Sequence, residues 1–379
     1  MRKRFLSIIL TVCMLLSMLP QTALAANTIN IQGNNYTIGG EVTTTGLDLN
    51  TAPSENTYYK AGDGYILWNG NGALTLNNAT IDITTSSAFA LTLKNDADVH
   101  LMLEGQSVLK AKESTIKCDD GNYKCLYIAK YINNGGTLSV SSETASAMDL
   151  GLMKVSVNSE VTLIVGDDAR NKDVPLIQKI DFLYNFGTLK FPKGTTNEEI
   201  KEMNIVSYGE TMIDDTIIGI AEGIVYPWGG DVTNTGLDLD VNTPTLDTYY
   251  KAGIGYLLFS PSNGTLTMGN MNMMANQDKP LITLPKRDIK LVLKGFNTLE
   301  NTYNSNTFAM AIQQGELLNI GGSAIAIEPK NYSLTFSGEG VLDVRTSENQ
   351  ASSISTDGTF VMESGTVKKW PGTEKKLRY

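Results

Sequence analysis

The sequence predicts an all-β protein that is a solenoid, a parallel β-helix made of two tandem homologous units. The first observation behind this prediction is a long internal repeat, in which residues 41–109 recur as residues 231–299. The offset between the copies starts at 190 residues, drifts to 192 and returns to 190. Such small insertions and deletions are tolerated in loops and turns but not in packed strands. The duplicated segment therefore consists of short strands joined by turns.

The second observation is a period-two alternation of apolar and polar residues in short runs, which indicates half-buried strands. Pairs of turn-forming residues, such as Asn77-Asn78 and Asn95-Asp96, separate these runs. The third observation is a short phrase, a glycine followed by alternating apolar residues. It recurs at residues 72–76, 136–140, 187–191, 264–268, 340–344 and 358–362.

The spacings of this phrase fit a coil of about 17–26 residues that repeats along the chain. Strands this short, with turns this regular, build either a β-sandwich or a parallel β-helix. The coil-like spacing and the asparagine-rich turns, which can stack into ladders, favour the β-helix. The side chains that we expect to face its interior are those of Leu74, Leu76, Ile81, Leu101, Leu103, Leu138, Leu189, Leu266, Leu291, Leu293, Leu342 and Phe360.

Four segments follow from this organisation. We expect a signal peptide at residues 1–25, a first β-helical domain at 26–194, a linker at 195–214 and a second β-helical domain at 215–379. The linker contains Thr-Thr-Asn-Glu-Glu-Ile, which resembles a capping box and predicts a short helix from Asn197 to Asn204. Near the start of each unit, Ile218-Gly-Ile220 echoes Ile29-Asn-Ile31, so each unit is expected to open with its own strands. One continuous solenoid is the alternative.

The N-terminus has the pattern of a secretory signal. Arg2, Lys3 and Arg4 form a basic region, residues 5–19 are apolar, and Ala23-Leu24-Ala25 fits a cleavage site. A transmembrane anchor fits less well, because the apolar run is short and the cleavage pattern follows at once. We therefore expect an extracellular protein, released or held at the cell surface, whose mature chain does not insert into a membrane.

The charge balance excludes some partners. Cleavage would remove three of the 30 basic residues and none of the 40 acidic ones, which leaves 27 minus 40, or −13. Nucleic acids and anionic membranes both reward clustered lysine and arginine, so neither is an expected partner. An acidic chain does permit calcium, which prefers carboxylate and carbonyl oxygens.

Two cysteines would remain in the mature chain, Cys118 and Cys125, on either side of the segment Asp-Asp-Gly-Asn-Tyr-Lys. An oxidising compartment favours a local disulfide between them. A reactive thiol pair is a weaker interpretation. A zinc site is weaker still, because His100 is the one histidine of the chain.

An aromatic block is the best-preserved part of the repeat. It allows two interpretations. Exposed aromatic rings can stack on the apolar face of a sugar, and aromatic side chains can also cover the open end of a solenoid. The residues that we assign to the candidate carbohydrate platform are Tyr58, Tyr59, Tyr65 and Trp68 in the first copy, and Tyr249, Tyr250 and Tyr256 in the second.

Adjacent aspartates mark the candidate calcium loops. Asp167, Asp168 and Asp173 share one oxygen-rich loop, and Asp119 and Asp120 share another. Neither loop matches an EF-hand signature, and solvated turn carboxylates are the alternative interpretation.

The sequence argues against an enzyme. A glycosidase needs two carboxylates flanking the scissile bond, which acidic pairs can supply. His100, however, lies in Val-His-Leu-Met-Leu, where we expect an exposed strand residue rather than a catalytic one. A polysaccharide lyase of this shape would need an arginine or lysine base beside carboxylate-bound calcium, and of the arginines outside the signal only Arg170 lies in an acidic loop.

Several of these phrases resemble one group of proteins. Residues 61–83 and 99–109, together with Leu-Lys-Gly-Phe-Asn-Thr-Leu at 293–299, resemble secreted β-helix proteins of clostridia and other gut Firmicutes. These are described as carbohydrate-binding domain proteins, and the resemblance covers about two thirds of each copy. It implies a right-handed parallel β-helix that binds acidic plant polysaccharide with calcium. The family's calcium ligands find no position-by-position match in this chain.

We therefore expect a secreted, non-catalytic carbohydrate-binding protein. A structural cell-surface or adhesion protein is the alternative from another class, and a polysaccharide lyase or glycosidase is a weaker one.

Overall fold

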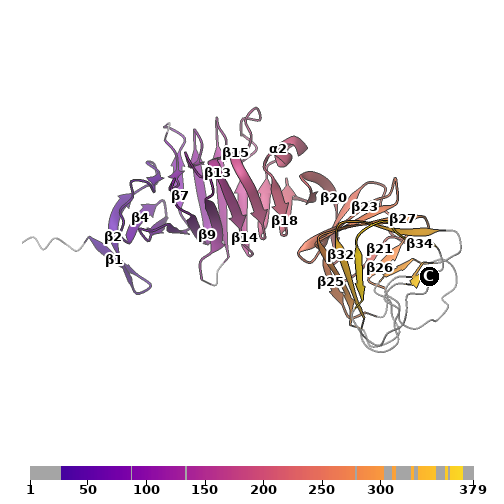
Figure 1. Cartoon of the computed structure of the whole chain (residues 1–379). Helices are drawn as coiled ribbons and strands as arrows, with labels where there is room; N and C mark the ends of the chain where they lie inside the picture. The colour runs from indigo at the N-terminus through magenta and orange to yellow at the C-terminus, as the bar shows by residue number, and fades with distance from the viewer. Residues whose placement is uncertain are drawn as a thin grey trace, which may run out of the picture.

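The protein is described by a computed structural model that covers residues 27–86, 88–132, 135–277, 280–302, 310–312, 326–327, 332–346, 355–356 and 359–369. The expected signal peptide and the side chain of Phe360 lie outside the described residues. The described chain is nearly all-β, and its one helix is α2 (Asn197–Glu202). The predicted all-β class is therefore confirmed. Figure 1 shows the strands of the first half stacked side by side, with a second stacked body after β20.

Three sets of strands pair in parallel along the first half. The first set is β6 (Ala73–Asn77), β9 (Val99–Ala111), β11 (Cys125–Lys130), β13 (Met148–Val157), β15 (Ile177–Asn185) and β17 (Ile205–Ser207). The second is β7 (Thr80–Ile83), the end of β9, β12 (Gly136–Ser142), β14 (Val161–Val165), β16 (Thr188–Phe191) and β18 (Glu210–Ile213). The third is β3 (Leu47–Asp48), β8 (Leu91–Thr92), β10 (Ile116–Lys117) and the starts of β13 and β15.

The second half repeats this arrangement. One set is β24 (Thr265–Gly269), β27 (Ile289–Lys294), β31 (Ser333–Gly338) and β34 (Thr359–Met362). Another is β25 (Asn272–Ala275), β28 (Phe296–Asn301), β32 (Val341–Thr346) and β35 (Thr366–Lys369). The last is β21 (Leu237–Asp238), β26 (Ile282–Leu284), β29 (Met310–Ile312), β30 (Ala326–Ile327) and β33 (Ser355–Thr356).

The register of the parallel strands determines which side chains form the core. Leu74 pairs with Leu101, and Leu101 pairs with Ile128, so like side chains stack from one strand to the next. Alternate residues of a strand point to opposite faces, so each such row faces inward along its whole length. All the residues predicted to face inward, apart from Phe360, are fully buried; they are Leu74, Leu76, Ile81, Leu101, Leu103, Leu138, Leu189, Leu266, Leu291, Leu293 and Leu342.

Each copy opens with its own strands, as the sequence predicted, and these strands form antiparallel hairpins. In the first copy these are the hairpin β1 (Thr28–Ile31) and β2 (Asn34–Glu41), then β4 (Thr57–Ala61), β5 (Gly64–Trp68) and β6. In the second they are β19 (Thr216–Ala221), β20 (Ile224–Asp231), β22 (Thr248–Ala252), β23 (Gly255–Ser260) and β24. Gly62 begins a two-residue loop at φ +65°, which suits a tight hairpin and reverses the chain.

Two buried cores lie along the chain, one from Val42 to Ile220 and one from Val232 to Val344. The hairpin β19–β20 belongs to the second copy, yet Ile218, Ile220 and Val225 pack on the first core. Its rung Ile220↔Val225 matches the rung Asn30↔Asn35 of the first hairpin, in which the two amides bond to each other at 2.8 Å. The register thus matches Thr28, not Ile29, to Ile218, one residue away from the sequence echo.

We predict that Leu101→Ala lowers the free energy of unfolding by about 2–5 kcal/mol, because it leaves a cavity in a fully buried row. Val108→Ala is the matched control on the same strand, since the Val108 side chain is 41% exposed, and its cost is expected within about 0.5 kcal/mol. Denaturant unfolding of both variants checks this. Equal losses in the two variants would contradict the assigned inward row.

Candidate ligand-binding surface

The outer face of the first strand set carries a group of aromatic side chains. His100 and Tyr127 are partners in register, and their rings stack with centroids 4.7 Å apart. Phe182 and Tyr184 lie 5.9 Å apart on β15, and Phe186 stacks on Tyr208 at 5.0 Å. We call these six residues the aromatic stripe. Phe182 and Phe186 are 38% and 47% exposed, so both rings are partly open to solvent.

Strand alternation places the aromatic stripe outside. On β11, Leu126 and Ile128 are buried, so Tyr127 between them points outward. On β15, the buried Leu183 and Asn185 leave the alternate positions to the stripe. Of this stripe, sequence analysis expected His100 to be an exposed strand residue, and the structure confirms it. It missed the other five residues, because it sought aromatics that recur in both copies. The alternating segments at 125–130 and 180–186 contained the signal.

A pocket of about 470 Å³ lies where the aromatic stripe meets the second half of the chain. Phe182 and Tyr208 line it from the first half, and Tyr256 lines it from β23. Phe186 stacks on the Tyr208 ring, and Tyr208 also lines this pocket. We call this the junction pocket.

The polar side of the junction pocket contains an ion pair between Lys294 and Glu222. Next to it, Tyr256 stacks on Tyr249 at 5.6 Å, and Tyr249 stacks on Trp228 at 5.8 Å. Burial, with the nearby charge of Glu222, raises the pKa of Tyr256 to about 12, and burial also raises the pKa of Tyr249. Both hydroxyl groups therefore stay protonated at neutral pH and can donate hydrogen bonds.

Three residues of the candidate carbohydrate platform are partly exposed, namely Tyr58, Tyr65 and Tyr256. In the first copy, the rings of Tyr58 and Tyr65 lie 5.7 Å apart. Asn77 Nδ2 donates to the Tyr65 hydroxyl at 3.1 Å and to Glu104 Oε2 at 2.6 Å. These contacts form a polar cluster on the outer surface of the first copy.

The other four platform residues are buried. Trp68 is fully buried, and its Nε1 donates to the Pro53 carbonyl at 2.7 Å. Tyr59, Tyr249 and Tyr250 are each at most 6% exposed. Consecutive strand residues face opposite sides, so Tyr58 and Tyr59 do not share one surface. The Tyr59 ring packs so close to Gly39 that a Cβ there would lie 2.4 Å from it, which helps to explain why the position is glycine.

The candidate calcium residues are engaged in turns and ion pairs. Asp167 Oδ1 accepts a bond from the backbone of Ala169 at 3.0 Å, and Asp168 Oδ1 accepts one from Lys193 at 3.1 Å. Asp173 donates its own N–H to Asn171 Oδ1 at 3.0 Å. Over the described ranges, no three acidic, histidine or cysteine side chains converge into a metal site. A calcium site at these residues stays a prediction.

Buried Arg170 organises the loop that contains Asp167, Asp168 and Asp173. Its guanidinium contacts Glu199 at 2.8 and 3.1 Å, and Glu199 also completes the predicted capping box at the start of α2. In the other acidic loop, Asp119 pairs with Lys117 at 2.9 Å, and the N–H of Asn122 bonds to Asp120 at 3.4 Å. These contacts help to hold the two acidic loops in place.

The two cysteines are free thiols, so the expected disulfide is not formed. Cys118 continues the buried row of Leu49 and Leu93. Cys125 precedes the buried Leu126 and therefore faces outward, where its thiol lies within hydrogen-bonding reach of the Tyr127 side chain. Thiols on opposite faces of their strands cannot meet without a rearrangement of the backbone. The spacing of the cysteines suggested a disulfide, but the side-chain directions set by strand alternation keep the two thiols apart.

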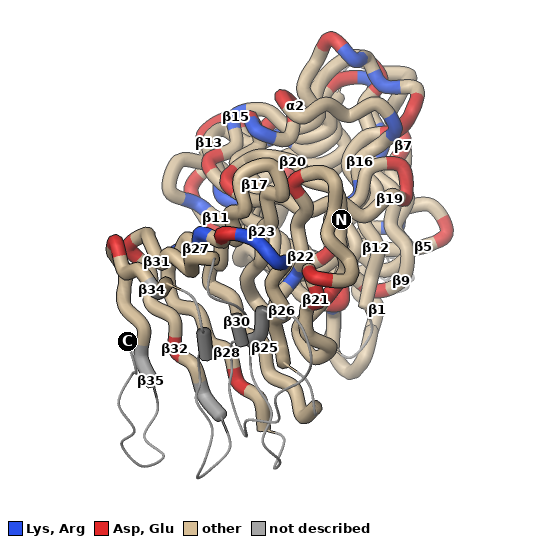
Figure 2. Tube along the Cα trace, turned by 90° about the vertical axis from the view of Figure 1, so that its right-hand side faces the viewer, with Lys and Arg blue, Asp and Glu red and all other residues tan. Residues whose placement is uncertain are grey.

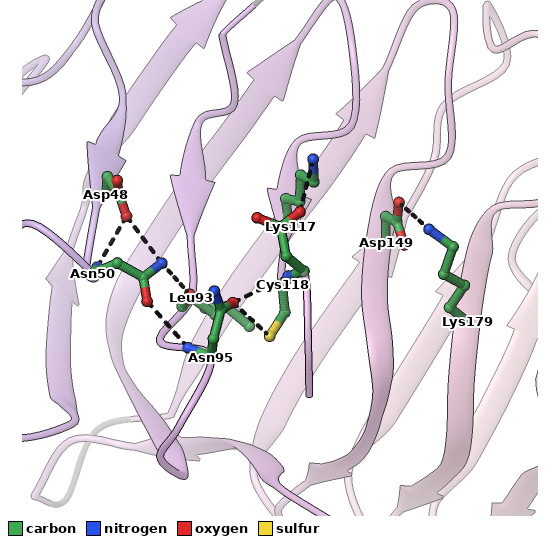
Figure 3. Close-up of polar contacts among 9 residues, drawn as sticks. Asp48, Asn50, Leu93, Asn95, Lys117, Cys118, Asp149 and Lys179 are labelled. Carbon is green, nitrogen blue, oxygen red and sulfur yellow. Dashed lines mark hydrogen bonds and ion pairs between the residues drawn. The ribbon is translucent and has the colours of Figure 1, made fainter. Parts of the chain in front are cut away.

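An asparagine ladder surrounds Cys118 (Figure 3). Asn50 Nδ2 donates to the Leu93 carbonyl at 3.0 Å, and Asn50 Oδ1 accepts from the N–H of Asn95 at 3.1 Å. Asn95 Oδ1 in turn accepts from the N–H of Asp119 at 3.1 Å and from the Cys118 thiol at 3.5 Å. The contacts satisfy backbone groups at successive turns, so this ladder is structural.

Figure 2 shows lysine and arginine interspersed with aspartate and glutamate around β13, β15 and α2. Comparisons with protein-family models, with curated proteins and with solved structures find no match for this chain. Within the part of the chain that the structure describes, no helix has the length and apolar character to cross a membrane.

We predict that a thiol reagent modifies Cys125 in the native protein and reaches Cys118 only after unfolding. Cys118 is 1% exposed, and burial raises its pKa to about 11, so little reactive thiolate forms below that pH. Mass spectrometry of native and denatured samples counts the modified thiols, with Cys125→Ala as the control. A protein isolated with both thiols oxidised would contradict the inward position of Cys118.

Proposed function

We propose that this protein is a secreted, non-catalytic carbohydrate-binding protein and that the junction pocket holds a sugar. The observation that carries this proposal is that Phe182 and Tyr208 meet polar side chains in one pocket. A sugar ring stacks its apolar face on an aromatic ring while polar groups bind its hydroxyls. The volume of about 470 Å³ lies in the range of small-molecule sites. Secretion rests on the signal-like N-terminus.

We also propose that the stacked strands form two tandem right-handed parallel β-helices. The three parallel strand sets in each half support this proposal, because the chain visits each set once before returning to the first. Crossover connections between parallel strands are right-handed in about 98% of cases. The antiparallel strands at the start of each copy would then cover the beginning of each helix.

Binding without catalysis fits the lining of the junction pocket. Glu222 is the one carboxylate among its lining residues, and it pairs with Lys294. A glycosidase of the usual kind needs two carboxylates across the scissile bond. The rival function, a structural surface or adhesion protein, would leave the pocket without a sugar ligand.

We predict that Tyr208→Ala weakens glycan binding about tenfold, because it removes an aromatic face that stacks on the sugar. The matched control is Tyr123→Ala, since Tyr123 is 87% exposed and lies outside the aromatic stripe. A glycan array with plant, host and microbial glycans identifies the ligand, and calorimetry compares the variants. Silence across the array would favour the structural protein, and release of reducing ends or unsaturated uronides would favour an enzyme.

For a polyuronate ligand, we predict that binding requires calcium. Both the protein and the polymer would be negatively charged, and they would repel each other unless a cation lay between them. Calcium should then also raise the melting temperature, because a ligand that prefers the folded state stabilises it. Thermal melts and pull-down on pectic polymer, each with chelator or with calcium, check this. Equal results under both conditions would remove calcium from the proposal.

A further inference from the structure

Residues from both halves of the chain line the junction pocket. Because the chain is duplicated, the wall that the second copy contributes can be compared with the equivalent positions in the first copy. Tyr65, Asn77 and Glu104 are consecutive partners across β5, β6 and β9. Tyr256, Gly269 and Lys294 hold the same register positions across β23, β24 and β27. The first copy of this wall follows no earlier strand stack in the described chain, whereas the second faces the end of the first stack.

The two copies of this wall differ in their contacts. In the first copy, the Asn77 side chain bonds to both Tyr65 and Glu104, so the three polar groups satisfy one another. In the second copy, Gly269 has no side chain there, and the Tyr256 ring lies where a Cβ of residue 269 would be, 2.2 Å from it. Lys294 instead pairs with Glu222 from the turn of the hairpin β19–β20.

The aromatic stripe is also restricted to one copy. The outward row that contains His100 and Tyr127 in the first half is occupied in the second half by Thr265, Lys290 and Thr335. The described part of the second half thus has no aromatic residues on the corresponding row. Two equivalent sugar sites, one per copy, do not fit this difference.

We propose that the two halves build one composite site for a neutral sugar at their junction, in which the first half supplies the aromatic faces and the second supplies the polar wall. This inference rests on the carbohydrate-binding function proposed above and deepens it. The site contains Phe182 and Tyr208 on one side, and Tyr256, Lys294 and Glu222 on the other.

A neutral sugar fits the charges better than a uronate does. The Lys294 ammonium is already neutralised by Glu222, so a sugar carboxylate would meet the Glu222 charge as well as the lysine. Adjacent sugar hydroxyls, in contrast, can donate to the carboxylate and accept from the ammonium in charge-assisted hydrogen bonds. Lys201 of α2 is the one other cation in the lining, and it is exposed to solvent, which screens its charge.

The test uses the full mature chain and a panel of tetrasaccharides made of β-linked glucose, xylose or mannose, with tetragalacturonate in the presence of calcium as the acidic arm. Calorimetry measures affinity for the wild type and for Phe182→Ala, Tyr256→Phe and their combination. We expect each single variant to weaken binding of a neutral tetrasaccharide about five- to tenfold, because one removes a stacking face and the other a hydrogen-bonding hydroxyl. The double variant should bind more weakly than either single variant, since both walls contact one ligand.

Tyr65→Phe tests the alternative of one site per copy, because it removes the equivalent hydroxyl of the candidate platform in the first copy; the composite site predicts a smaller loss for it than for Tyr256→Phe. Circular dichroism and melting temperature show whether each variant is folded, and Phe182, being partly exposed, can be exchanged for leucine if alanine unfolds the chain. Equal losses for Tyr65→Phe and Tyr256→Phe would mean one site per copy and would overturn the composite site. Binding of tetragalacturonate alone would overturn the neutral ligand and keep carbohydrate binding. No binding by any member of the panel would overturn this inference, and the glycan array then decides whether carbohydrate binding itself fails.

Discussion

The structure depends on keeping the inward rows in register from strand to strand. A parallel pair such as β9 and β11 satisfies the backbone of both strands and stacks Leu101 on Ile128 in the same step. A shift of one residue would turn every leucine of a strand outward, so the register is strongly determined. The same constraint determines the outer surface. Once Leu126 and Ile128 point inward, Tyr127 must point outward, and its partner in register must be His100.

A stack of this kind needs a cover at each end, since its last row would otherwise expose apolar side chains. The opening hairpins of the two copies, β1–β2 and β19–β20, have different roles. In the first, the rung Asn30↔Asn35 directs amides to solvent and bonds them to each other, which suits a terminal cover. In the second, the same rung is Ile220↔Val225, and it packs on the core of the preceding half. The second hairpin is also joined to the first half by strand pairing, because β19 pairs antiparallel with β18.

The sequence was sufficient to predict the rows of leucine and isoleucine, because the alternation of apolar and polar residues along a strand directly reflects which side chains are buried. It was not sufficient to predict which face a side chain takes after a turn, because the turn decides how the alternation of one strand continues into the next. The spacing of the cysteines suggested a disulfide. The two side chains nevertheless point to opposite faces of their strands, Cys118 into the core and Cys125 outward. Likewise, Trp68 looked like part of a platform, and the hairpin reversal at Gly62 turns it inward against Pro53.

The junction pocket could not be predicted from either copy alone, because it exists only where the end of one stack meets the beginning of another. Tyr208 lies at the last strand of its set, and Tyr256 lies at the first strands of the next copy. Two copies have two beginnings but only one junction, so duplication of the chain does not duplicate this pocket. The polar cluster of Tyr65, Asn77 and Glu104 has the register of the pocket wall and lacks the facing aromatic end. In the second copy Gly269 takes the place of Asn77, so the tyrosine there lacks this internal hydrogen-bond partner. In the proposed site, its hydroxyl bonds to the ligand instead.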